Sequence, residues 1–306
     1  MSLSVLYDAP GPKTRRLSKI ASIVGIFLII ALFVWLYLLL AAPRVNANGA
    51  IQPGTFDPSR WDIVGRADLW ESFGFATLNT LRMAAIAAVL AIAIGILFSF
   101  GRTSRFAWIR VVTSVILEFV RGIPVLLMIF FVFLVFTAGS YWSGVIGLGL
   151  YNGAIIGEAL RAGVKSLPRG QREAGLAVGL TPLKTWALIE FPQAFRQMLP
   201  IILAQLVVLL KDTSLAFIVS YPELARTIGN NSNFFGSRYI FTMFAIGFAI
   251  YLTLNLTMSW LARFVARRSG PKLGKALPNT PKQIGEDGTR AITLPRSLHG
   301  PSDPPR

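Results

Sequence analysis

The chain has 306 residues, of which 54% are hydrophobic and only 14% are charged. Soluble domains carry roughly 25% charged residues, so this composition indicates a membrane protein. The chain has no cysteine and a single histidine, His299, which excludes disulfides, iron–sulfur clusters and histidine-based metal or triad chemistry. We therefore expect no catalytic residue and no metal site.

The apolar residues are gathered into six runs, each close to the roughly 20 residues that a helix needs to cross a bilayer. The runs lie at about 20–42, 73–99, 111–137, 143–160, 197–220 and 239–262. We therefore predict an all-α, polytopic membrane protein. Its segments are 1–19 at the N-terminus, a transmembrane helix 20–42, an external loop 43–72, a core 73–265 and a tail 266–306. The tail is rich in Pro and Gly and lacks apolar periodicity, so we expect it to be disordered.

The first apolar run has two interpretations. Its basic lead and the string Val45-Asn46-Ala47 resemble a signal peptide with its cleavage site. The apolar run 20–42 is longer, however, than the roughly 7–15 residues of a signal-peptide core. We therefore expect the run to be retained as a transmembrane helix.

The net charge of +16 fits a membrane topology better than nucleic-acid binding. Lys and Arg gather in alternate connections, which are segments 13–19, 101–110, 161–196 and the tail. Cytoplasmic loops collect Lys and Arg. We therefore predict a multi-pass protein of the cell membrane, with both termini and the connection 161–196 in the cytoplasm.

That connection carries the signals of two short helices. A first helix is expected from Pro168 to Gly179, because proline suits a helix start and glycine a left-handed helix end. A second helix is expected to begin at Thr181-Pro182, with Thr181 as N-cap, and to stop near Pro192. Both helices have apolar faces, which favour a protein partner; the alternative is a loop lying on the membrane surface.

The spacing of this connection resembles a known motif. The strings Glu173-Ala174-Gly175, Gly179 and, after nine intervening residues, Ile189-Glu190-Phe191-Pro192 are similar to the EAA loop of permease subunits of bacterial ABC importers. Two positions depart mildly from that pattern, with Gly175 in place of alanine and Phe191 in place of leucine.

Flanking strings resemble the polar amino-acid permeases within that group. They include Glu118-Phe-Val-Arg121-Gly122-Ile-Pro124 and Leu210-Lys211-Asp212-Thr213-Ser214-Leu215, and the resemblance covers about 73–265. The long tail also resembles that of glutamate permease subunits of high-GC Gram-positive bacteria. The resemblance implies a five-helix type I permease core, to which the first transmembrane helix is an addition.

The resemblance also implies a function and partners. The chain would form the pore of an ATP-driven importer of a polar amino acid, with glutamate or another acidic or amide amino acid favoured. An extracellular or lipid-anchored binding protein would deliver the cargo, and a second permease subunit, identical or not, would complete the pore in the lipid.

A cytoplasmic dimer of ATP-binding-cassette ATPases would drive the cycle by alternating access, through a coupling loop at about 165–195. Its contacts with the ATPase would be Glu173, Ala174, Gly175, Gly179 and Pro192. This chain has no phosphate-binding Gly-x-x-x-x-Gly-Lys-Ser/Thr motif. It would bind no cofactor, since ATP and magnesium would sit on the partner. The alternative from another class is a secondary transporter or channel that works alone.

Charges inside apolar runs are costly and usually face a cavity or a partner. Glu118 and Arg121 are three residues apart, as are Glu158 and Arg161, so each pair shares a helix face and is expected to be structural.

Four consecutive polar residues, Lys211, Asp212, Thr213 and Ser214, fall deep in the fifth run. A carboxylate there could hold the ammonium of an amino acid, and the alternative is a structural polar network. Arg82 either extends to the outer membrane surface or faces the pathway, where its guanidinium would suit a substrate carboxylate.

Overall fold

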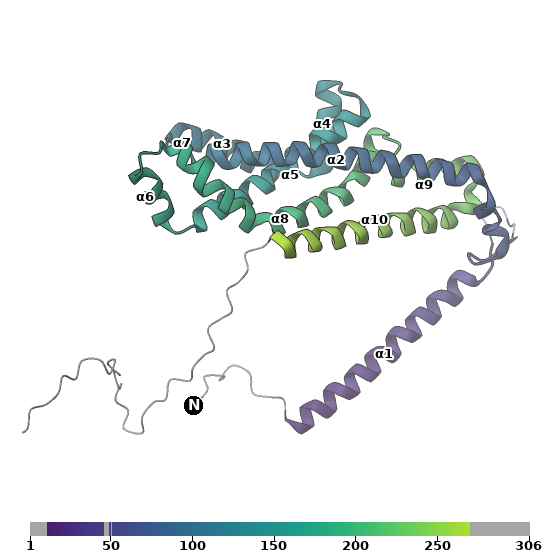
Figure 1. Ribbon diagram of the computed structural model, residues 1–306. Helices are drawn as coiled ribbons and strands as arrows, with labels where there is room; N and C mark the ends of the chain where they lie inside the picture. The colour runs from purple at the N-terminus through teal and green to yellow at the C-terminus, as the bar shows by residue number, and fades with distance from the viewer. Residues whose placement is uncertain (1–10, 46–48, 50, 270–306) are drawn as a thin grey trace, which may run out of the picture. The chain divides into compact units, whose positions relative to one another are not determined.

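The computed structural model of the chain describes residues 11–45, 49 and 51–269, which fold mainly into helices (Figure 1). The α-helices are α1 (Pro12–Ala41), α2 (Ala67–Thr103), α3 (Ala107–Gly122), α4 (Val125–Phe136), α5 (Gly139–Ser166), α6 (Arg169–Ala177), α7 (Pro182–Thr185), α8 (Phe191–Asp212), α9 (Leu224–Phe235) and α10 (Ile240–Ser269). Shorter helical turns are η1 (Pro58–Arg60), η2 (Asp62–Gly65), the π-helical η3 (Trp186–Glu190), η4 (Thr213–Val219) and η5 (Ser237–Tyr239). Two short strands, β1 (Arg44–Val45) and β2 (Ile51–Gln52), pair antiparallel.

Five stretches of the described chain are helical and apolar enough to cross a membrane. They contain α1, α2, α5, α8 with its flanking turns, and α10. The third apolar run, 111–137, is not one continuous helix. It is divided between α3 and α4, which are bent by 104°. The break falls at Ile123, which takes an extended conformation because a following proline, here Pro124, disfavours the helical one.

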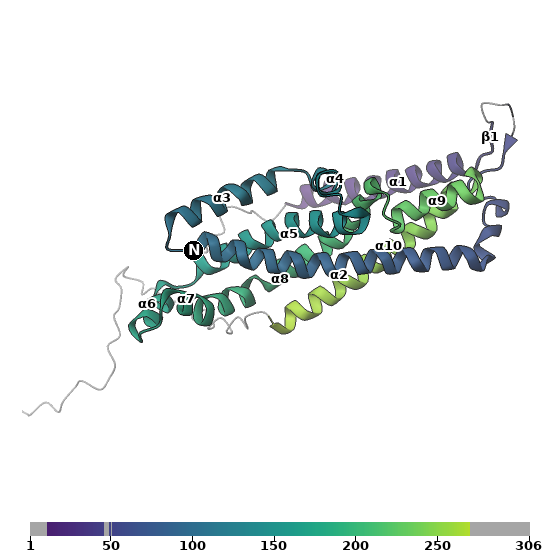
Figure 2. The same ribbon diagram turned by 90° about the horizontal axis from the view of Figure 1, so that it is seen from above.

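Helices α2 and α5 lie side by side and run in the same direction (Figure 2). The contacts between them advance together along both helices, from Met83 against Gly144 to Phe98 against Gly157. Two parallel neighbours need a return crossing between them. The bent pair α3–α4 supplies it, so we count this pair as one span, which gives six spans among the described residues.

Glycines of α5 allow this close approach. A Cβ on Gly157 would lie 2.8 Å from the Cβ of Phe98 and 3.1 Å from the carbonyl oxygen of Gly95. Lipid tails are as apolar as leucine, so helices associate in a membrane through packing of this kind, and small residues favour it. The sequence of α5 is glycine-rich for this reason.

Substituting Gly157 by alanine is expected to destabilise the protein by about 1–3 kcal/mol, because the new methyl group meets the backbone of α2. Gly74→Ala, in α2, is the matched control, since a Cβ there meets nothing within 4 Å. Alanine favours helix over glycine by about 1 kcal/mol, so the control should be neutral or stabilising. Thermal unfolding in detergent measures both, and a Tm of Gly157→Ala at or above that of the wild type would contradict the packing argument.

The segment between α1 and α2 is folded rather than a plain loop. Phe56 stacks on Tyr37 of α1, with ring centroids 5.2 Å apart, and meets Phe241 of α10 edge to face at 5.8 Å. The guanidinium of Arg60 donates to the carbonyl oxygen of Arg238, and the guanidinium of Arg238 donates to that of Ser59. These contacts tie the end of α1 to the start of α10.

Several segment boundaries differ from the prediction. Helix α1 begins at Pro12, within the predicted N-terminal segment 1–19, and none of its apolar window is buried. The predicted external loop 43–72 ends earlier, because α2 begins at Ala67. Helix α10 extends to Ser269, past the predicted start of the tail at 266. The rest of the predicted disordered tail, 270–306, lies outside the described residues.

Candidate functional site

The predicted two-helix connection is present, and its first helix begins one residue later than expected. Helix α6 follows Pro168, which is its N-cap rather than its first residue. Gly179 has a φ of +83°, in the left-handed region that favours glycine after a helix. The side chain of Thr181 accepts a hydrogen bond from the backbone N–H of Lys184, and Pro182 is the first residue of α7.

The prediction that the second helix stops near Pro192 is wrong. The chain passes from α7 through η3 into α8 and stays helical to Asp212. A proline interrupts a helix because its ring crowds the preceding turn and it lacks an N–H group. Here Pro192 lies in the first turn of α8, directly after a π-helical turn that widens the helix. Such π-turns occur mostly as single insertions in α-helices, frequently at functional sites.

Within the loop, the predicted contact residues divide into exposed and buried ones. Glu173, Ala174, Gly179 and Pro192 are exposed, and Gly175 is buried. A Cβ on Gly175 would lie 2.7 Å from the Cγ2 atom of Thr185. The close approach that Gly175 permits is therefore that of α6 to the second helix of the same loop.

Aromatic packing attaches the loop to the end of α2. The ring of Trp186, in η3, meets Phe100 edge to face at 5.1 Å and Phe191 at 4.9 Å. On the other side, the guanidinium of Arg172 lies 3.9 Å from the carboxylate of the buried Glu190, which links α6 to η3. The loop is thus a hairpin of helices that packs on the end of α2 and is closed by its own Arg172–Glu190 contact, with Glu173 and Ala174 exposed.

Near the loop, the predicted charge pairs form one cluster. A guanidinium nitrogen (Nε) of Arg161 donates to Glu158 at 3.0 Å. Arg121 lies 3.6 Å from Glu118, a looser contact on the surface. Arg102, at the end of α2, lies between them: it donates to Glu158 at 2.6 Å and lies 3.6 Å from Glu118.

Arg102 was missed by the sequence analysis as a member of this cluster. It is separated from Glu158 by 56 positions in the sequence, and only the fold brings the two together. One feature of the sequence could have indicated this role. Arg102 lies at the end of an apolar run and has no acidic residue near it in the sequence, so its partner had to come from another helix.

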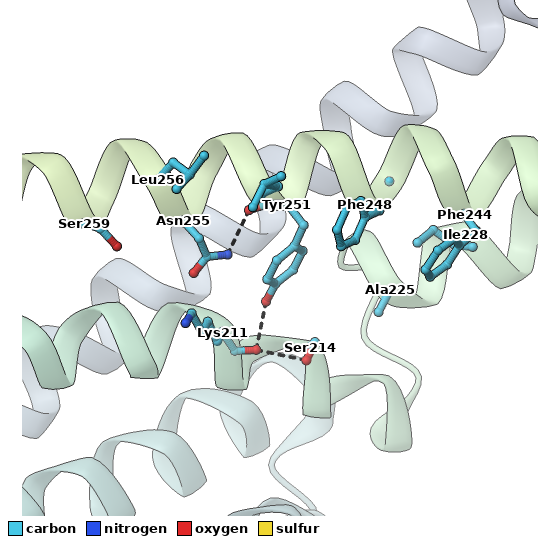
Figure 3. Close-up of a pocket in the computed structure, with 12 residues that line it drawn as sticks. Lys211, Ser214, Ala225, Ile228, Phe244, Phe248, Tyr251, Asn255, Leu256 and Ser259 are labelled. Carbon is cyan, nitrogen blue, oxygen red and sulfur yellow. Dashed lines mark hydrogen bonds between the residues drawn. The ribbon is translucent and has the colours of Figure 1, made fainter. Parts of the chain in front are cut away.

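The second predicted site, at the end of α8, adjoins a pocket of about 520 Å³ between η4, α9 and α10 (Figure 3). Lys211 and Ser214 line it, together with Tyr251 and Asn255 of α10. The hydroxyl of Tyr251 donates to the carbonyl oxygens of Leu210 and Lys211, at 2.8 and 2.9 Å. Tyr251 and Asn255 are pocket residues that the sequence analysis did not single out.

The structure does not bring all the predicted pathway residues together. The hydroxyl of the buried Thr213 donates to the carbonyl oxygen of Leu210 at 2.7 Å, which is a structural contact. Asp212 is half-buried and is not among the residues that line the pocket. Arg82 is exposed on α2, and within the described chain no carboxylate lies within ion-pair distance of it.

A further polar contact crosses the buried part of the bundle. The side chain of Gln205 in α8 donates to the side-chain oxygen of Asn152 in α5 at 2.8 Å. Asn152 in turn donates to the carbonyl oxygen of Leu148.

Within residues 11–45, 49 and 51–269, no group of three His, Asp or Glu side chains could hold a metal ion.

Within the part of the chain that the structure describes, six spans and a basic connection shaped as a helical hairpin define a multi-pass membrane protein. The model of the family described as "Binding-protein-dependent transport system inner membrane component" matches residues 91–270. The chain belongs to this family. This membership favours the first of the two functions expected from the sequence over a transporter or channel that works alone.

Individual relatives agree with this assignment. The chain is 31% identical over 248 residues to the "Glutamate transport system permease protein GluD" of Corynebacterium glutamicum, covering 78% of this chain and 89% of the relative. It is 34% identical over 208 residues to the "Probable glutamine ABC transporter permease protein GlnP" of Bacillus subtilis, covering 64% and 91%.

A solved amino acid ABC transporter "with histidines" has the same fold. The TM-score is 0.60 at 24% identity, and the match covers 68% of this chain and 98% of that one. The predicted type I permease core is thereby confirmed. Helix α1 precedes the residues that the family model matches.

Proposed function

We propose that this chain forms the pore of an ATP-driven importer of glutamate or another acidic or amide amino acid. The observation that carries the proposal is the hairpin α6–α7, whose spacing from Glu173 to Pro192 matches the coupling loop of such importers. The names of the two relatives, a glutamate and a glutamine permease, support the cargo.

The proposed partners follow from the same family. A binding protein delivers the amino acid outside the cell, a second permease subunit completes the pore, and a pair of ATPase subunits binds ATP and magnesium in the cytoplasm. Six spans put both termini on one side. The basic connections at α2–α3 and α5–α6 support the proposal that this side is the cytoplasm.

In the proposed cycle, the ATPase contacts the exposed residues Glu173 and Ala174. Glu173 pairs with a base of the ATPase, and Gly179 sets the turn that presents α6. Closure of the ATPases displaces the hairpin as a rigid body and exchanges the inward- and outward-facing states. Because α7, η3 and α8 are continuous, that displacement reaches Lys211 through one helical segment.

At the pocket, the ammonium of Lys211 is proposed to hold a carboxylate of the amino acid, with Ser214 and Tyr251 as neutral partners. The carboxylate of Asp212 remains the candidate for the α-ammonium of the substrate. Arg82 remains a second candidate for a substrate carboxylate, at the exposed surface of α2.

Substituting Lys211 by methionine is expected to reduce ATP-driven uptake of glutamate at least about tenfold, since a charge-assisted hydrogen bond contributes roughly 1.5–3 kcal/mol. The ATPase activity should persist. Ser259→Ala, at another part of the same pocket, is the control and should transport normally. The assay uses the complete importer in proteoliposomes, with glutamate, glutamine, aspartate, arginine and histidine in competition.

Two results would contradict the proposal at different levels. Uptake without ATP would contradict the function itself. Unchanged uptake and cargo preference in Lys211→Met would contradict the role of the pocket and leave the function standing.

A further inference from the structure

A strongly basic pocket lies beside the hairpin, at the ends of α2, α3 and α5. Its volume is about 570 Å³. Six bases line it against only two acids, Glu173 and Glu190; the bases are Arg102, Arg105, Arg110, Lys165, Arg169 and Arg172. Such an excess of one charge attracts ligands of the opposite charge.

Most of these bases have no acidic partner. Arg102 is engaged by Glu158, and Arg172 lies near Glu190. Arg105, Arg110, Lys165 and Arg169 have no carboxylate within ion-pair distance among the residues that the structure describes. Arg110 donates to the carbonyl oxygens of Ser104 and Arg105, which carry no net charge. The pocket therefore presents four positive charges that no carboxylate of the described chain compensates.

The basic region continues along α3. A second pocket of about 340 Å³ shares Arg102, Arg110 and Lys165 with the first and adds Arg161. Its remaining lining is Val111, Ser114 and Val115, all on α3. The second pocket thus extends the first onto this helix, and its added base, Arg161, is paired with Glu158.

The outward face of α3 is apolar over its whole length. Trp108, Val111, Val115 and Phe119 are between 61% and 69% exposed, while Leu117 and Val120 on the other side are buried. A charged head region followed by an apolar strip is complementary to an amphiphile. A small soluble anion would use the pockets and leave the strip of α3 uncovered.

We propose that this chain binds an anionic phospholipid at this place. Its phosphate groups lie among Arg105, Arg110, Lys165 and Arg169, and its acyl chains lie along the apolar face of α3. Basic pockets between spans on the cytoplasmic side are known to take such headgroups. Because four bases without a carboxylate partner surround the site, a lipid with two phosphates, such as a diphosphatidylglycerol, fits better than one with a single phosphate.

The lipid site has a consequence for the hairpin, and this consequence rests on the proposed function. The pocket wall includes Arg169 and Arg172 of α6, the helix that is proposed to meet the ATPase. A bound lipid therefore contacts α6 on the side of the α2–α3 turn and links it to the fixed part of the bundle.

The test measures lipid retention on the full-length chain, purified with its partner subunits, by native mass spectrometry after incubation with defined lipids. The double variant Arg110→Gln/Lys165→Gln is expected to retain at least about tenfold less diphosphatidylglycerol than the wild type. The matched control is Arg263→Gln/Arg267→Gln, which removes two exposed bases of α10 outside both pockets. A charge-preserving variant, Arg110→Lys/Lys165→Arg, should retain the lipid.

Each remaining outcome decides against part of the proposal. Equal retention by the double variant and the control would overturn the site. Equal retention of phosphatidylcholine would show that the bases do not select the lipid. Displacement of the lipid by millimolar inorganic phosphate would identify a free phosphate as the ligand. Thermal unfolding, and the single variant Lys165→Gln, separate these results from misfolding, and ATP-driven uptake reports separately on the proposed function.

Discussion

Substituting Gly175 by valine is expected to reduce ATP-driven uptake at least about tenfold while the protein still inserts and folds. The Cβ of any larger residue would lie 2.7 Å from the Cγ2 atom of Thr185 and 2.9 Å from the Cδ1 atom of Ile189. A valine would therefore push α6 away from the second helix of the hairpin, at a cost of about 1–3 kcal/mol. The measurement is uptake in proteoliposomes together with the ATPase activity that cargo stimulates.

Gly170→Val is the matched control, because Gly170 belongs to the same helix and a Cβ there meets nothing within 4 Å. It should transport nearly as well as the wild type. Gly175→Ala should be intermediate, because the Cδ1 atom of Ile189 is the end of a flexible side chain. If Gly175→Val transported at the wild-type rate, the internal packing of the hairpin would not matter for coupling.

Substituting Glu158 by glutamine is expected to lower the free energy of unfolding by about 2–4 kcal/mol. The change leaves two guanidinium groups, those of Arg102 and Arg161, without the carboxylate that both contact at the end of the bundle. Their side chains are 16% and 17% exposed, so solvent replaces the lost partner only in part. Removal of one member of a buried ion pair is strongly destabilising for this reason. Thermal unfolding of the full-length chain in detergent measures the loss.

Glu118→Gln provides the comparison, since Glu118 is 61% exposed and its ion pairs are both 3.6 Å long. Exposed pairs contribute roughly 0–1 kcal/mol, so this variant should unfold close to the wild-type temperature. Equal losses for the two variants would mean that burial at Glu158 has no role. A double variant Arg102→Gln/Glu158→Gln should recover part of the stability, because fewer charges are then left unpaired.

Local signals predicted local structure well. Gly179 and Thr181-Pro182 define the hairpin because a left-handed glycine and a capped helix start depend on few neighbours. The charge pairs three residues apart were also predictable, since helical spacing alone brings them onto one face. The apolar runs gave the spans for a similar reason, because crossing a bilayer needs length and composition only.

The errors arose where a proline or a distant residue decides the structure. Pro124 ends one helix and Pro192 does not end another, because the backbone around each differs in a way that composition does not reveal. Arg102 joins the charge cluster through the contact of three helices. The polar residues of α10 in the pocket, Tyr251 and Asn255, became visible only when α10 was placed beside the end of α8.

Pro182 and Val219 bound a single helical stretch of 38 residues. One end is the hairpin, and the other passes the pocket at Lys211. The hydrogen-bond pattern of the stretch is interrupted at Pro200, which lacks an N–H group, and is irregular at the π-helical turn η3. We expect a displacement of the hairpin to be passed along this stretch to Lys211, less whatever bending at these two places absorbs.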